Sequence, residues 1–144
     1  MENVISHESN PEEIPKKNQR FVLLDTNFIL SCVKNKIDFF NEIPLMGYNI
    51  IIPKEVIKEI ENISKSKQKL KEKDMAKLAS VILKMNQFKK INLNTKNVDN
   101  GIIQFAKQNP DVIVATLDRV IKNSLKKKNK IMIIRENDRL EIVG

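Results

Sequence analysis

Short runs of apolar residues alternate along the chain with longer segments in which apolar residues recur every three or four positions. The short runs predict strands, and the periodic segments predict amphipathic helices. The expected strands are residues 21–25, 48–52, 89–93, 112–116, 131–134 and 140–143. The expected helices are residues 27–34, 37–43 (ending before Pro44), 54–64, 67–87, 98–108 and 118–128.

The strands are rich in β-branched residues and lack polar alternation, which is typical of a parallel sheet buried on both faces. Strands that alternate with helices predict an α/β protein with three α/β/α layers and doubly wound topology. Residues 1–19 contain turn residues and no sustained period, so we expect a flexible tail there. Residues 20–144 then form one domain, which is large enough to bury a core.

Four acidic residues stand at matched places in this pattern. Asp25 closes the first expected strand and Asp118 follows the strand 112–116. Glu59 and Asp99 have apolar residues three and four positions away on their helices, so we expect both to face inward. Doubly wound sheets bind ligands beyond the carboxyl ends of their strands. Because carboxylates against apolar surface need compensation, the pattern predicts bound divalent cations and phosphodiester hydrolysis.

Each acid also has an ordinary explanation. Asp25 and Asp118 are suitable helix N-caps, and Asp99 suits the positive end of a helix dipole. Glu59 is able to form a salt bridge with a lysine at the edge of the core. None of these explanations accounts for the four residues together. Beside Asp25, Thr26 or Asn27 is placed to orient the carboxylate or a water molecule.

The amino-acid composition excludes several classes of active site. Three glycines leave no glycine-rich phosphate loop, and the single histidine, His7, lies in the tail. The single cysteine, Cys32, excludes a disulfide framework and any multi-cysteine metal site. A site built from oxygen ligands alone suits Mg²⁺ or Mn²⁺.

The chain carries a net charge of +8, and residues 21–144 carry 23 bases and 14 acids, a net charge of +9. Such a basic domain commonly binds nucleic acid, although the lysines also suit a solvated surface. Arg119 is a candidate phosphate contact next to Asp118. We expect lysines in residues 65–73 and 126–130 to contact phosphates near the acids. The lysines of the first segment that we assign to RNA binding are Lys65, Lys67, Lys69 and Lys71.

The chain has no apolar run long enough to span a bilayer and no signal-peptide pattern at its start. We therefore expect a cytoplasmic protein without membrane contact.

Five stretches of the chain form an ordered series of motifs: 21–30 (FVLLDTNFIL), 51–60 (IIPKEVIKEI), 98–103 (VDNGII), 114–119 (VATLDR) and 130–135 (KIMIIR). With these motifs, residues 21–144 resemble the PIN-domain nucleases, in the archaeal branch related to ribosomal-RNA-processing PIN proteins and VapC-type toxins. The resemblance implies a metal-dependent ribonuclease, with RNA as substrate and an endonucleolytic cut. It assigns Asp25, Glu59, Asp99 and Asp118 as catalytic metal ligands. The supporting groups are Thr26, Asn27 and Thr116.

Two positions depart from the family pattern. Asn100 stands where a second aspartate is frequent, and Leu117 stands where a polar residue is common. A degenerate PIN-like module that binds RNA or a ribosome-assembly partner without cutting is one alternative. An aspartyl-phosphate phosphatase is another, although it needs a second acid where Asn27 stands. Toxin and housekeeping roles both remain open, as do a homodimer, an antitoxin and a ribosome-assembly protein as partners.

Overall fold

A computed structural model describes residues 8–9, 19–67 and 70–144 of the chain. Within these residues, one seven-stranded sheet has the order β1-β4-β3-β2-β5-β6-β7. All neighbouring strands are parallel except β6 and β7, which form an antiparallel hairpin. The mostly parallel sheet expected from the sequence is confirmed. Its strands are β1 (Glu8–Ser9), β2 (Phe21–Leu24), β3 (Asn49–Pro53), β4 (Lys89–Ile91), β5 (Ile113–Ala115), β6 (Ile131–Arg135) and β7 (Arg139–Val143).

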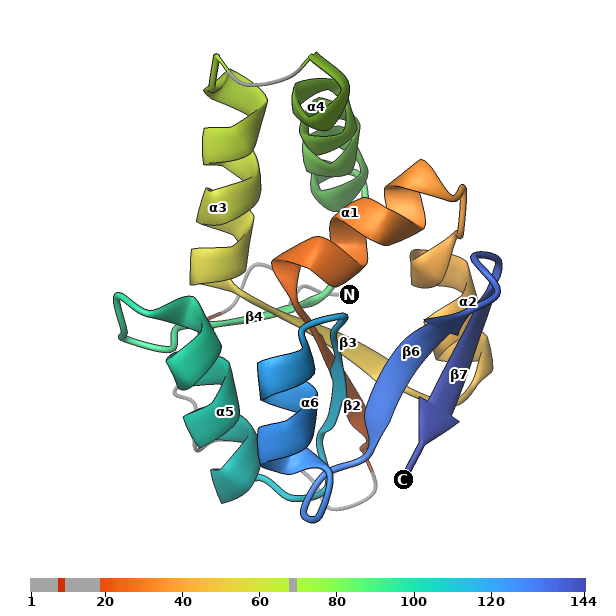
Figure 1. Cartoon of the computed structure of the whole chain (residues 1–144), viewed down its shortest axis with the longest axis vertical. Helices are drawn as coiled ribbons and strands as arrows, with labels where there is room; N and C mark the ends of the chain where they lie inside the picture. Colours follow the sequence, from red (N-terminus) through yellow and green to blue (C-terminus); the bar gives the residue numbers. More distant parts are fainter. Residues whose placement is uncertain (1–7, 10–18, 68–69) are drawn as a thin grey trace.

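The helices connect the strands and cover both faces of the sheet. They are α1 (Thr26–Lys34), α2 (Phe39–Leu45), α3 (Lys54–Lys65), α4 (Leu70–Lys84), α5 (Val98–Gln108) and α6 (Arg119–Leu125). Right-handed crossovers place α1 to α4 on one face and α5 and α6 on the other, because the chain reverses direction across the sheet after β4. Figure 1 shows α5 and α6 beside each other, and α3 and α4 as a separate upright pair. The three-layer α/β/α fold is therefore confirmed.

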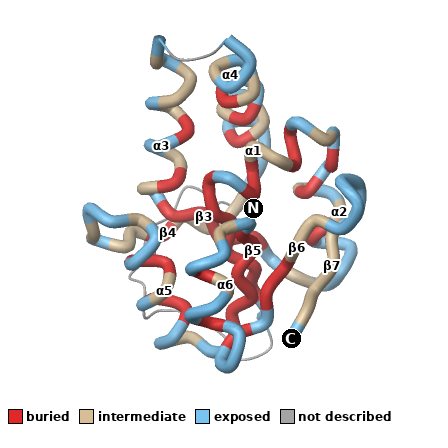
Figure 2. Tube along the Cα trace, in the orientation of Figure 1, coloured by how far each residue is buried: buried red, intermediate tan, exposed pale blue. Residues whose placement is uncertain are grey.

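The core lies around the three central strands, β3, β2 and β5. Leu23, Ile51 and Val114 are fully buried, because helices cover these strands on both sides. Figure 2 shows buried positions along these strands and along the inward stripes of the helices. Cys32 of α1 belongs to this core, and burial raises the pKa of its thiol to about 12.

Some boundaries differ from the prediction. Pro44 lies inside α2 rather than after it, because a proline in the last turn of a two-turn helix removes only one hydrogen bond. Helix α4 ends at Lys84, three residues earlier than expected, and residues 68–69 of its predicted start lie outside the described residues. The predicted tail also lies mostly outside them, and its flexibility stays a prediction. Within it, β1 pairs with β4, a strand that the sequence pattern did not predict. No helix in the described ranges is long and apolar enough to cross a membrane.

The strand order reverses between β2 and β5. Leu24 pairs with Ala115, and the backbone N–H of Asp25 donates to the Ala115 carbonyl at 3.0 Å. From here the chain leaves β2 toward β3 and leaves β5 toward β6. The carboxyl ends of β2 and β5 therefore form the topological switch point at which such sheets bind ligands.

Candidate active site

Asp25 directly follows β2 at the switch point and is only 4% exposed. It is the N-cap of α1, as its ordinary explanation predicted, and its Oδ1 accepts from the Thr26 N–H at 2.7 Å. Its Oδ2 accepts from the Thr116 hydroxyl at 2.8 Å. Burial raises the pKa of Asp25 to about 6, although both hydrogen bonds oppose the rise; the charges of Asp99 and Glu59 add to it.

Thr116 joins Asp25 to the loop that carries Asp118. Its side chain is fully buried after β5, and its hydroxyl accepts from the Asp118 N–H at 3.0 Å while donating to Asp25. Asp118 caps α6, because its Oδ1 accepts from the Ile121 N–H at 3.0 Å. A carboxylate offers two oxygens, so capping a helix does not prevent Asp118 from binding a cation.

Glu59 is connected to Asp25 through Thr26. The Thr26 hydroxyl donates to Glu59 Oε1, while the Thr26 backbone N–H donates to Asp25. We expected Glu59 to lie on the buried stripe of its helix, and this expectation is wrong, because Glu59 is exposed. The buried stripe of α3 runs through Val56 and Ile60, and Glu59 lies at its border. This position leaves its carboxylate accessible to solvent and to ligands.

Asp99 occupies the first turn of α5, whose N-cap is Asn97. The expected inward orientation is also wrong, because Asp99 is exposed and the buried face includes Ile102 and Ala106. Partial burial and the negative charge of Asp118 raise its pKa. Asp99 therefore interacts electrostatically with both Asp25 and Asp118.

Asp25 and Asp118 are the N-caps of α1 and α6, Asp99 lies in the first turn of α5, and Glu59 lies one turn further along α3, so all four stand toward the carboxyl end of the parallel strands. Figure 1 shows the first turns of α1, α3, α5 and α6 turned toward the middle of the molecule. Their oxygen-only donor set fits a hard divalent cation, and their mutual repulsion favours binding one. In the part of the chain that the structure describes, no group of three or more His, Cys, Asp or Glu side chains is already close enough to hold a metal. A cation would have to draw the carboxylates together.

Residues 22–139 match the family described as the PIN like domain. The chain belongs to this family. It is 32% identical over 127 residues to Ribonuclease VapC4 of Methanocaldococcus jannaschii, covering 85% of this chain and 96% of that protein. This agreement confirms the predicted family.

Two solved structures resemble this PIN-like domain. The structure of the PIN domain endonuclease Utp24 superposes with a TM-score of 0.67 at 25% identity, over 85% of this chain and 90% of that chain. VapBC2 from Rickettsia felis, bound to a DNA fragment from its promoter, gives a TM-score of 0.53 at 16% identity, over 78% and 98% of the two chains. The second likeness concerns the fold alone.

A hollow of about 650 Å³ opens beside Asp118, one of the four predicted acids of this PIN-like domain. Asn27, Lys71 and Asp118 line it together with apolar side chains that include Leu117. One predicted RNA-binding lysine, Lys71, thus shares a surface with Asp118. Lys65 is the last residue of α3 and Lys67 follows it, and both are exposed. Lys69 lies outside the described residues. Arg119 is exposed at the start of α6.

The lysines of residues 126–130 do not lie near the acids, contrary to the prediction. They precede β6, whose start lies at the amino end of its parallel neighbour β5, whereas Asp118 follows the carboxyl end of β5. The turn that carries these lysines and the acids are therefore at opposite ends of the parallel strands.

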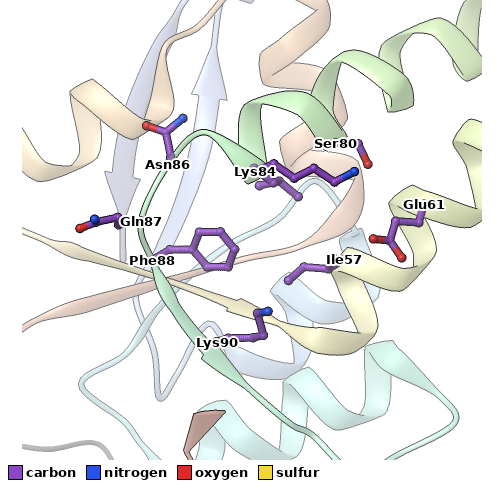
Figure 3. A pocket seen from close by; sticks show the side chains of 9 residues that line it. Ile57, Glu61, Ser80, Lys84, Asn86, Gln87, Phe88 and Lys90 are labelled. Atoms are coloured by element: carbon purple, nitrogen blue, oxygen red, sulfur yellow. The ribbon is translucent and has the colours of Figure 1, made fainter. Parts of the chain in front are cut away.

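A second hollow, of about 490 Å³, lies between α3, α4 and β4. Figure 3 shows Phe88 and Ile57 facing this space, with Glu61, Lys84 and Lys90 around it. None of the predicted site residues lines it.

Sequence reasoning missed two residues that position Asp99. The Glu55 carboxylate accepts from the backbone N–H groups of Leu93 and Asn94, at 3.2 and 3.0 Å, and so fixes the loop before α5. Gly101 packs so closely against this loop that a Cβ would clash with Thr95 Cγ2 and lie 3.2 Å from Leu93 Cβ. A glycine inside a helix was the available signal for Gly101. Nothing local distinguishes Glu55 from a solvated acid.

Proposed function

We propose that this PIN-like domain is a ribonuclease that cuts RNA internally with the help of Mg²⁺ or Mn²⁺. The observation that carries the proposal is the hydrogen-bonded network at the switch point, which runs from Glu59 through Thr26 to Asp25, and from there through Thr116 to Asp118. The names of the related ribonuclease and endonuclease support this chemistry.

In this proposal Asp25, Asp99 and Asp118 hold the principal cation, and Glu59 completes that site or helps to hold a second ion. A bound divalent cation neutralises phosphate charge and lowers the pKa of an attacking water. Thr116 fixes the direction of the Asp25 carboxylate, because it donates to one of its oxygens. The products have a 5′-phosphate and a 3′-hydroxyl.

The approach of RNA follows from the surroundings of the acids. Arg119 and Lys71 are exposed beside Asp118 and supply positive charge for the phosphates on either side of the cut. Only six phenylalanines and one tyrosine are present in the chain, so we expect recognition by backbone and shape rather than by stacked bases.

Cleavage of end-labelled RNA tests the proposal, with Mn²⁺, Mg²⁺ or a chelator, for the wild type, Asp25→Asn and Asp99→Asn. Asp74→Asn is the matched control, because Asp74 is exposed on α4 and has the same side chain. We expect cleavage that requires the cation, that both site variants lose and that the control retains. Cleavage that survives in Asp25→Asn would mean that another protein or another site cuts the RNA.

The alternative is an RNA-binding PIN-like module that does not cut. The exposed positions of Glu59 and Asp99 and the absence of a preformed metal group among the described residues favour it. RNA binding without cleavage in any of the three ionic conditions would establish this alternative.

The biological role follows from partners rather than from the site. The relatives include a VapC ribonuclease and an endonuclease named Utp24, so a toxin paired with an antitoxin and an RNA-processing enzyme are both proposals. Affinity purification of the tagged chain from its own cells separates them. A small antitoxin as partner supports the toxin role, whereas ribosome-assembly proteins support RNA processing. Size-exclusion chromatography of the purified chain tests the homodimer.

A further inference from the structure

The protein surface at the amino ends of the parallel strands, opposite the acids, is strongly basic. We refer to this side as the amino edge. Lys126, Lys127, Lys128 and Lys130 are exposed in the turn between α6 and β6, and Arg20 is exposed immediately before β2. We call these five residues the amino-edge basic surface. Together they line a hollow of about 450 Å³, whose acidic side chain is that of Asp111. Figure 1 shows the α6–β6 turn at the lower end of the molecule.

Hydrogen bonds hold the backbone of this turn in place. The buried side-chain amide of Asn129 donates to the carbonyls of Ala106 and Val112 at 2.9 and 3.0 Å. The Val114 N–H donates to the Lys130 carbonyl at 3.1 Å, which ties the turn to β5. The lysine side chains therefore project from a fixed backbone.

Helix capping explains only part of this charge. A lysine after the last turn of α6 complements the helix dipole. Lys130 and Arg20 have no such role, because they precede strands β6 and β2. Arg20 lies 5.1 Å from the ring centroid of Tyr48, which places an aromatic face next to the cations. Five exposed cations and one acid around one hollow leave a positive potential that attracts a polyanion.

We propose that the amino-edge basic surface binds the sugar-phosphate backbone of the RNA substrate at a distance from the cut bond. This inference rests on the proposed ribonuclease function. The strands that run from the amino-edge basic surface to the acids have three to five residues, so roughly 10–17 Å separates this surface from the acids. An RNA strand shorter than this separation cannot contact both the acids and this surface, whereas a longer or folded RNA can. The surface therefore favours structured RNA over short fragments.

The test compares two variants that lose the same charge, Lys127→Ala with Lys128→Ala, and Lys77→Ala with Lys84→Ala. All four lysines are exposed, and the second pair lies on α4, away from the turn. Binding of a labelled RNA hairpin is measured by anisotropy in chelator between about 50 and 200 mM salt, where affinity reports phosphate contacts. Cleavage of a short single strand is measured in parallel with Mn²⁺.

We expect the turn pair to weaken hairpin binding roughly tenfold and to reduce the slope of log affinity against log salt by about 1.5, since each phosphate contact contributes about 0.7–0.9. The α4 pair should change neither, and the turn pair should cut the short strand at the wild-type rate. Equal losses in both pairs, or no loss in the turn pair, would overturn the inference. Because binding is read in chelator, a wild type that cuts nothing refutes the proposed function without deciding this result.

Discussion

Replacing Asp25 by asparagine should stabilise the metal-free protein at alkaline pH. The pKa of Asp25 is raised from its ordinary value of 3.8 to about 6. One pKa unit corresponds to ~1.4 kcal/mol, so ionised Asp25 costs the folded state about 3 kcal/mol. Asparagine removes this charge but cannot accept both hydrogen bonds with equal strength. We therefore expect a net gain of about 1–2 kcal/mol at pH 8.

The sign of the pH dependence follows from the raised pKa. Asp25 contributes stability that is fully present below pH 3.8 and is lost as the pH rises through about 6, because the folded state holds the proton more tightly than the unfolded chain. Urea denaturation in chelator at about pH 4 and pH 8 measures this, with Asp74→Asn as control. The difference between wild type and Asp25→Asn should change by about 2 kcal/mol between the two pH values, because Asp25 of the unfolded chain is already partly ionised at pH 4.

Addition of Mn²⁺ at pH 8 should reverse the order of stability. A cation that binds only the folded state stabilises it by mass action, and Asp25→Asn lacks one of the proposed ligands. The wild type should gain more stability than the variant. The reasoning is refuted if Asp25→Asn shifts stability equally at both pH values, or if both proteins respond equally to Mn²⁺.

Two further substitutions test how the first turn of α5 is positioned. Glu55→Gln should lower the free energy of unfolding by about 1–2 kcal/mol and slow cleavage, because the glutamine N–H₂ group would face the Asn94 N–H, which is also a donor. Chemical denaturation measures the first effect and RNA cleavage the second. Unchanged values would show that the hydrogen bond between Glu55 and Asn94 is unimportant. Gly101→Ala should cost about 1–3 kcal/mol because its Cβ would clash with Thr95 Cγ2. Adding Thr95→Ser, which removes that methyl group, should recover part of the melting temperature, and no recovery would place the strain elsewhere.

The parts of the fold that the sequence predicted are those with local signals. The run before Asp25 is apolar at every position because β2 is buried on both faces, and the same holds for β5 before Thr116. The ends of buried strands are therefore visible in the pattern, and with them the positions of Asp25 and Asp118. Helical periodicity also singled out Glu59 and Asp99, although this signal is weaker than a strand end, and the family resemblance supported both.

The errors concern properties that depend on distant segments. Helical periodicity identified the apolar neighbours of Glu59 and Asp99, but it does not show where the covering layer ends, and both acids lie at that border. The lysines after Leu125 are close to Asp118 in sequence, yet the seven residues of α6 carry the chain about 10 Å back along the sheet. Glu55 contacts Leu93 and Asn94, which lie 38 and 39 positions further along the chain, and no local pattern predicts this contact.

The buried thiol of Cys32 provides an intrinsic probe of opening of the core. It is the single cysteine of the chain, it is fully buried in α1, and its pKa of about 12 leaves almost no reactive thiolate at neutral pH. Alkylating reagents should therefore label the folded protein only as fast as the region around α1 opens. Because Asp25 caps the start of α1, labelling rates with and without Mn²⁺ would show whether cation binding slows opening next to the acids, without any engineered label.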